Sequence, residues 1–284
     1  MIIDFHTHVF PPQIKKNRDR YIDSDPCFAI LYSDKKAKLA TTDEIINSMD
    51  QAGIDVSVIT NIGWTTHELC VETNDYILES INRYPDRLVG FCSVQPLSLQ
   101  AALDELERCA SGGIRGVGEI RPDIQLLDMN DEEVMGPFAY TLHQLNLILL
   151  THSSEPVGHI YAGKGAVTPE IMYPFIAAHP ELTIVGAHWG GGLPFYALMP
   201  EVKKALANVY FDSAASPFLY SPQIYEQVAA IVGDDKILLG SDWPLMAQDR
   251  LIKEVQSTDL PDESKDKILG GNAARLLGLG DKAC

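Results

Sequence analysis

Eight short apolar runs alternate with amphipathic stretches, and this alternation limits the possible folds more than any other feature of the chain. The runs span residues 2–5, 55–62, 87–94, 113–120, 145–152, 182–188, 208–214 and 236–242. Most are continuously apolar, as is typical of strands buried on both faces of a parallel sheet. Eight strands and intervening helices in roughly 250 residues predict an α/β fold, the (β/α)8 TIM barrel. A doubly wound open sheet is the alternative, because the pattern does not show closure.

The sequence predicts where several helices begin and end. Thr41 and Glu44 predict a capping box, and Gly53 a helix end. Ser98 is predicted to cap the helix that follows it. Further limits are predicted at Thr168–Pro169, at Gly233 and, as a bend in a closing helix, at Gly270–Gly271.

Two connections are too long to be simple turns. They cover residues 9–40, after the first strand, and residues 153–167, after the fifth. Long βα loops of a barrel lie on the rim where sites are built, so both are interpreted as lids or binding loops. No repeat, low-complexity tract or linker interrupts the pattern, which predicts a single domain over residues 1–284.

The composition excludes several partners. Acidic residues outnumber basic ones by 39 to 22, giving a formal charge of -17 that disfavours nucleic acid and anionic membranes. The five scattered cysteines (Cys27, Cys70, Cys92, Cys109, Cys284) argue against a disulfide framework and favour a reduced, cytoplasmic setting. We see no signal peptide and no apolar run near the roughly 20 residues that span a bilayer. The expected partner is a small-molecule substrate, and pairing into a homodimer is left open.

Ionisable residues gather where the predicted strands end. His6 and His8 follow the first run two residues apart, so in an extended chain they point to the same side. Four later strand ends carry Glu119, His152, His188 and Asp242. A barrel brings these ends together, where several imidazoles and carboxylates need a cation between them. The expected cofactor is a divalent metal, most often Zn²⁺ with such ligands, with Mn²⁺ or Fe²⁺ as alternatives.

Other polar and aromatic residues on the predicted rim are weaker candidates for substrate contact. Arg121, directly after the fourth strand, either pairs with a substrate carboxylate or forms a salt bridge on the rim. Trp189, His67 and His159 also follow strands and are assigned a substrate-binding role. His143 is expected on a helix, facing away from the site.

Four motifs give the chain a recognisable pattern. DFHTH at 4–8, THSSEP at 151–156, AHWGGGLP at 187–194 and GSDWP at 240–244 resemble the amidohydrolase superfamily. The similarity points to its amidohydrolase-related branch, which includes the aminocarboxymuconate-semialdehyde decarboxylase-like enzymes. The resemblance covers essentially the whole chain and implies a metal-bearing (β/α)8 barrel.

The resemblance also implies roles for individual residues. His6, His8 and His152 resemble metal ligands of the family. Asp242 resembles the carboxylate that touches the metal and handles protons. His188 resembles a catalytic acid/base or, in two-metal members, a ligand of the second ion.

Glu119 allows two interpretations. GVGEI resembles the strand of TatD-like enzymes, in which a carboxylate bridges two ions, although the other motifs do not. Glu119 either bridges two metals or orients a ligand histidine. The number of ions, one or two, depends on this choice. A nuclease activity of the TatD type fits poorly with the acidic charge.

Three functions remain open at this stage. The main hypothesis is a metal-dependent hydrolase of a small amide, ester or lactone, in which metal-bound water attacks and Asp242 acts as base and then acid. The alternative is a metal-dependent, non-oxidative decarboxylase of a small carboxylic acid. The third is a non-catalytic metal-binding barrel, against which His188 and the two long rim loops speak.

Overall fold

The computed structural model describes residues 1–161 and 163–280 and contains one eight-stranded parallel sheet in the order β1 to β8. Its strands are β1 (Ile3–His8), β2 (Val56–Thr60), β3 (Leu88–Cys92), β4 (Gly116–Ile120), β5 (Ile148–Thr151), β6 (Ile184–Gly186), β7 (Val209–Asp212) and β8 (Ile237–Leu238). The last strand returns to the first, because the backbone N–H of Asp242 donates to His6 O at 2.9 Å and that of His8 to Trp243 O at 2.7 Å. The sheet is thus a nearly closed barrel, and the open-sheet alternative is excluded.

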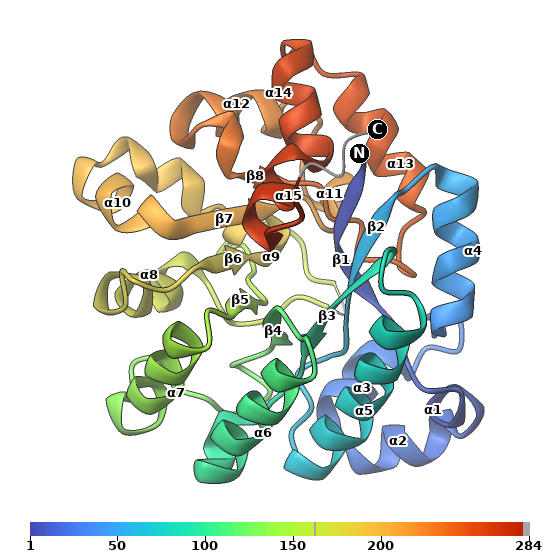
Figure 1. The fold of residues 1–284 in the computed structure, drawn as a ribbon. Coiled ribbons are helices and arrows are strands. Elements are labelled where there is room, and N and C mark those ends of the chain that lie inside the picture. The colour runs from blue at the N-terminus through green and yellow to red at the C-terminus, as the bar shows by residue number, and fades with distance from the viewer. Residues whose placement is uncertain (162, 281–284) are drawn as a thin grey trace.

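Helices surround the barrel (Figure 1). The α-helices are α1 (Pro12–Lys16), α2 (Arg18–Ser24), α3 (Pro26–Tyr32), α4 (Thr42–Ala52), α5 (His67–Arg83), α6 (Gln100–Ser111), α7 (Glu132–Gln144), α8 (Pro169–Ala178), α9 (Ala187–Gly190), α10 (Pro200–Ala205), α11 (Ser216–Leu219), α12 (Ile224–Val232), α13 (Gln248–Gln256), α14 (Asp262–Asp266) and α15 (Asn272–Leu277). Short helical turns are η1 (Pro96–Ser98), η2 (Leu193–Leu198), η3 (Leu206–Asn208), η4 (Asp234–Lys236) and η5 (Lys267–Gly271).

The core has two main layers. One apolar cluster joins the outer faces of the strands to the surrounding helices. A second takes side chains such as Phe5, Phe91 and Leu150 from the strands, and Leu277 of α15 packs against it. The one-domain prediction stays a prediction. No helix in the described parts of the chain is long and apolar enough to cross a membrane.

Most of the helix signals are confirmed. Glu44 accepts hydrogen bonds from the Thr41 backbone N–H at 2.8 Å and hydroxyl at 3.0 Å, and Gly53 ends α4 in the left-handed region, with φ of 73°. Helix α8 begins at Pro169, after Thr168. Gly233 ends α12. A π-helical turn, η5, includes Gly270 and Gly271, and the bend there stays a prediction.

The prediction for Ser98 is wrong. Ser98 ends the short turn η1, which begins at Pro96, and helix α6 starts only at Gln100. Leu99 separates the two with a φ of 50°, so Ser98 cannot cap α6.

The two long loops differ from each other. Residues 9–40 are not structureless, since they form α1 to α3, and these helices share an apolar cluster with Phe10 and Trp64. The described part of residues 153–167 has no helix or strand. His143 lies exposed on α7, as predicted. The four described cysteines are buried free thiols, whereas Cys284 lies outside the described residues.

Candidate metal centre

Four histidines gather around one glutamate at the carboxyl ends of the strands. Two groups of side chains have ligand atoms close enough to share a metal ion: His6, His8 and Glu119, and Glu119, His152 and His188. Glu119 belongs to both. Its Oε2 lies 3.8 Å from His6 Nε2 and 3.9 Å from His8 Nε2. Its Oε1 lies 2.8 Å from His152 Nδ1 and 3.3 Å from His188 Nε2.

A β-bulge turns the first two histidines inward. Strand β1 extends to His8, further than predicted, and its register against β2 shifts between Asp4 and Thr7. Side chains alternate between faces along a strand, and an inserted residue reverses that alternation. Phe5, before the shift, points into the barrel and packs against Phe91 with ring centroids 5.6 Å apart. Because the alternation is reversed there, the next residue, His6, also points into the barrel and joins the histidine cluster. The register of β4 shifts too, just before Ile120 and beside Glu119.

Outer hydrogen bonds determine which nitrogen each strand-one histidine presents. His6 Nδ1 lies 2.8 Å from Asp212 Oδ2, and His8 Nδ1 lies 3.1 Å from the carbonyl oxygen of Asn61. Both partners are acceptors, so in the neutral imidazole that a metal requires, each Nδ1 carries the proton and each Nε2 presents a lone pair. These two Nε2 atoms are only 3.1 Å apart. Two lone pairs at this distance repel unless a proton or a metal ion lies between them, so the neutral donor set fits a divalent metal.

His188, in the short helix α9 directly after β6, is held in a similar way. Its Nδ1 lies 3.0 Å from the carbonyl oxygen of Ala214, which leaves Nε2 to face Glu119. Its backbone N–H donates to Asp212 Oδ1 at 2.9 Å. His188 has a φ of 55°, uncommon outside glycine and frequent at functional sites.

Asp242 lies at the open edge of the cluster. Its Oδ1 is 3.1 Å from His8 Nε2. Its side chain is 16% exposed, compared with 0% for His6 and 9% for Glu119. Asp242 is therefore the most accessible of these three side chains from the rim.

The electrostatics of the cluster favour positive charge. Burial lowers the pKa of His6, but the nearby carboxylates of Asp212, Glu119 and Asp242 outweigh it and raise that pKa to about 10. Burial likewise opposes the charge on His188, yet Glu119 and Asp242 raise its pKa to about 9. Burial alone would raise the pKa of Glu119, whereas the histidines hold it well below its usual range. A bound metal ion would supply the positive charge that these carboxylates favour.

His152 differs because a cation lies beside it. Burial and then Arg121 lower the pKa of His152 to about 4, which keeps the imidazole neutral, as a metal ligand must be. Arg121 is buried, donates to the Gly163 carbonyl oxygen at 2.9 Å and lies 3.6 Å from Asp123 Oδ1. The rim salt bridge therefore exists, and substrate contact by Arg121 stays a prediction.

The other substrate-contact residues have different surroundings. Trp189 is fully buried and donates its indole N–H to Ser216 at 3.0 Å, so it has no free surface for a substrate. His67 opens helix α5 and is half-buried. His159 is exposed and lines a cavity on the rim.

Sequence reasoning missed the residues that orient the cluster. Asp212 ends the seventh strand, so the strand-end rule that marked Asp242 could have found it. Asn61 acts through its carbonyl oxygen, which no sequence signal marks. Ser154, whose Oγ lies 3.2 Å from His152 Nε2, was visible only as part of the THSSEP motif.

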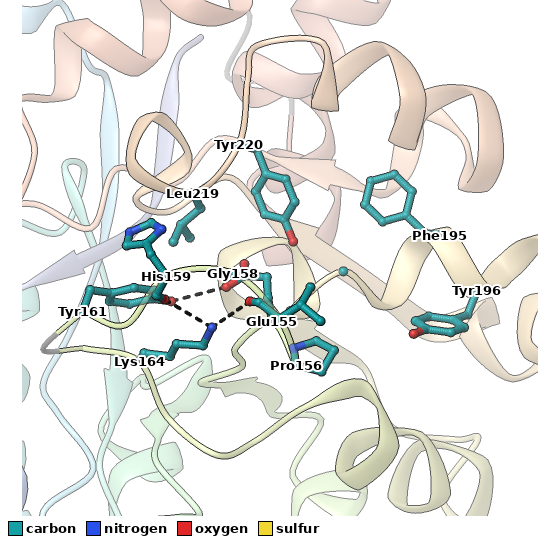
Figure 2. A pocket seen from close by; sticks show the side chains of 13 residues that line it. Glu155, Pro156, Gly158, His159, Tyr161, Lys164, Phe195, Tyr196, Leu219 and Tyr220 are labelled. Atoms are coloured by element: carbon teal, nitrogen blue, oxygen red, sulfur yellow. Dashed lines mark hydrogen bonds between the residues drawn. The ribbon is translucent and has the colours of Figure 1, made fainter.

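A cavity of about 350 Å³ lies beside the cluster on the same rim. Figure 2 shows aromatic side chains and Glu155 around it. No member of the histidine cluster lines it. Its lining residues include Glu155, directly after Ser154, and Gly191, three residues after His188.

Comparisons with known proteins agree with this architecture. A family model described as Amidohydrolase matches residues 3–279. A 2-amino-3-carboxymuconate-6-semialdehyde decarboxylase of Dictyostelium discoideum is 21% identical, over 98% of this chain and 91% of its own. A gamma-resorcylate decarboxylase of Rhizobium radiobacter is 24% identical, over 75% and 76%.

A solved structure shows the same fold. The 5-carboxyvanillate decarboxylase of Novosphingobium aromaticivorans, complexed with manganese and a nitrobenzoic acid, superposes with a TM-score of 0.78. It is 18% identical, and the match covers 98% of this chain and 96% of that one.

These comparisons correct the main functional hypothesis. The expected hydrolysis of an amide, ester or lactone is wrong, because the relatives are decarboxylases. The same metal-ligand motifs serve both reactions, so the motifs could not separate them. The expectation of zinc finds no support either, since manganese is the metal named. The expected superfamily is confirmed: the chain belongs to the amidohydrolase family of enzymes, in the branch of the aminocarboxymuconate-semialdehyde decarboxylase-like enzymes.

Proposed function

We propose that the protein is a metal-dependent, non-oxidative decarboxylase of a small aromatic carboxylic acid. The observation that carries the proposal is that the curated relatives named above are decarboxylases and align with at least three quarters of this chain. The cluster of histidines and carboxylates supports it, because its donor set fits a divalent cation.

In this proposal His6, His8, His152 and Asp242 hold the ion, and Glu119 lies at their centre as a further ligand or a bridge. A bound divalent ion would supply positive charge that orients an anionic substrate and stabilises charge developing on it. Mn²⁺ is the ion we would test first, given its presence in the related structure.

Arg121 would orient the substrate carboxylate. Its guanidinium is buried, and its Nε, although 3.6 Å from Asp123 Oδ1 in the rim salt bridge, has no hydrogen-bond acceptor among the described residues. A fixed cation with a spare donor suits a carboxylate. The bond to Gly163 also ties Arg121 to the loop after β5.

Asp242 and His188 are the candidates for handling protons. Decarboxylation breaks the bond between the substrate carbon and its carboxylate, and the electron pair stays on that carbon. A proton then takes the place of the departing carbon dioxide, and no electron acceptor is needed. Asp242, at the open edge of the cluster, is the better placed of the two; because its pKa is lowered, it would first accept a proton, from water or a substrate hydroxyl, and then pass it to the carbon.

The test is release of carbon dioxide by protein loaded with Mn²⁺. We would offer 2,6-dihydroxybenzoate, 5-carboxyvanillate and simpler hydroxybenzoates, and follow carbon dioxide and the decarboxylated ring together. Asp242→Asn should lower turnover by about a thousandfold or more, in line with loss of an acid–base group, while exposed His143→Gln should leave it unchanged. Turnover of none of these acids, or full activity of Asp242→Asn, would contradict the proposal.

A further inference from the structure

The cavity beside the metal centre has aromatic walls. It is open to solvent on one side and is lined by the loop after β5, the turn at Gly191–Gly192, two residues of η2, and Leu219 and Tyr220 at the end of α11. Its aromatic side chains are Tyr161, Phe195, Tyr196 and Tyr220 (Figure 2). A volume of about 350 Å³ is at the lower end of the range for small-molecule sites.

Glu155 is the one carboxylate among the residues lining this cavity. The Tyr161 hydroxyl donates to its Oε2 at 3.4 Å, and the Tyr220 hydroxyl faces the same side chain in Figure 2. Burial and then Glu155 raise the pKa of Tyr161 to about 12, and they raise that of Tyr220 as well. Both hydroxyls therefore stay protonated, and that of Tyr161 donates to the carboxylate.

One oxygen of Glu155 lacks a partner. Its Oε1 is buried and accepts no hydrogen bond from any described residue. Lys164, the cation that also lines the cavity, is engaged elsewhere: its ammonium donates to the carbonyl oxygens of Val157 at 2.7 Å and His159 at 3.3 Å. Glu155 has no ion pair within the described ranges. A buried acceptor without a donor costs free energy, which a donor from a ligand would relieve.

We propose that this cavity binds the ammonium group of a small aromatic amine. The ammonium would donate to Glu155, and aromatic faces around it would attract the positive charge. The acidic surface of the protein, with a formal charge of -17, would draw cations towards the rim. This site is separate from the proposed reaction, because binding there needs neither a metal nor turnover.

The test compares two probes of the same shape, phenethylamine and the neutral 2-phenylethanol, by isothermal titration calorimetry on the full chain, with and without Mn²⁺. We expect the amine to bind at least tenfold more tightly, as a charge-assisted hydrogen bond provides. Glu155→Gln should remove this preference, whereas the matched exposed variant Glu170→Gln should keep it. Phe195→Ala should weaken both probes, because it removes part of the wall that they share.

Two results would overturn the proposal. One is equal binding of amine and alcohol by the unmodified protein, and the other is an unchanged amine preference in Glu155→Gln. The first comparison needs no variant, so a folding defect cannot obscure it. Since neither probe has a carboxylate to lose, the outcome is independent of whether the protein decarboxylates an acid.

Discussion

His6 Nδ1 lies 2.8 Å from Asp212 Oδ2, and this pair decides which nitrogen of His6 faces the cluster. The other oxygen of Asp212 accepts backbone N–H groups from His188 at 2.9 Å and Ala214 at 3.0 Å. One carboxylate on β7 therefore orients His6 of β1 and His188 of α9, the short helix after β6. Such outer partners commonly affect metal affinity by 10- to 100-fold.

Asp212→Asn should weaken metal binding without unfolding the protein. The amide oxygen would keep the backbone bonds, so its NH₂ group would face His6 Nδ1 and move the imidazole proton to Nε2. We expect Mn²⁺ affinity to fall by about 10- to 100-fold, measured by titration of metal-free protein. Exposed Asp259→Asn controls for the loss of charge, and equal affinity in the two variants would remove Asp212 from this role.

Arg121→Lys should raise the KM for a carboxylate substrate more than it lowers kcat. Lysine keeps the charge but loses the planar fork that pairs with a carboxylate. We expect about a tenfold rise in KM, the effect of losing roughly one charge-assisted hydrogen bond, in steady-state assays. Arg115→Lys, an exposed change just before the opposite end of β4, is the matched control. An unchanged KM in Arg121→Lys would mean that Arg121 forms the rim salt bridge but does not contact the substrate.

Glu105 should make stability depend on pH in the acid range. Burial alone would raise its pKa, but hydrogen bonds from Arg108 and Asn74 outweigh this and lower it below 4.5. A carboxylate with a depressed folded pKa stabilises the protein above its unfolded pKa, and that contribution is lost as pH falls through the folded value. Urea titrations from pH 7 to 3 should therefore show a steeper loss below pH ~4.3 for the wild type than for Glu105→Gln. At pH 7 we expect Glu105→Gln to cost about 1–3 kcal/mol; parallel pH profiles would contradict the assignment.

Gly191→Ala should destabilise the protein more than Gly53→Ala. Both glycines have positive φ, 59° and 73°, so each substitution strains the backbone by about 1–2 kcal/mol. A Cβ at Gly53 meets open space, whereas one at Gly191 would overlap the Ser154 backbone beside His152. Thermal unfolding of the two variants isolates this contact. Equal losses would mean that the loop after β5 moves aside freely.

The fold and the members of the cluster were largely predictable from the sequence. Apolar runs ending in histidine or carboxylate are local signals, and closure of the barrel brings them together. The register shift in β1 was not predictable, because a bulge depends on pairing with β2 and not on the β1 sequence alone. The role of Asp212 depends on the approach of β1, which precedes it by about 200 residues.

The burial of Trp189 was also not predictable from the sequence. Trp189 follows His188 directly and was expected on the rim, but its left-handed backbone, with φ of 60°, accompanies a ring placed in the core. The choice between hydrolysis and decarboxylation was beyond the motifs, since ligands that hold a metal do not specify which substrate bond breaks.

The most direct test of the account is metal content per chain, measured by elemental analysis after loading with Mn²⁺ and removal of free ion. We predict at least one ion for the wild type and His143→Gln, and none for a His6→Asn/His8→Asn double variant that remains folded. Glu119→Gln would show whether a second ion depends on that carboxylate. Absence of bound metal from the wild type, or full retention in the double variant, would contradict the assignment of the cluster as a metal centre.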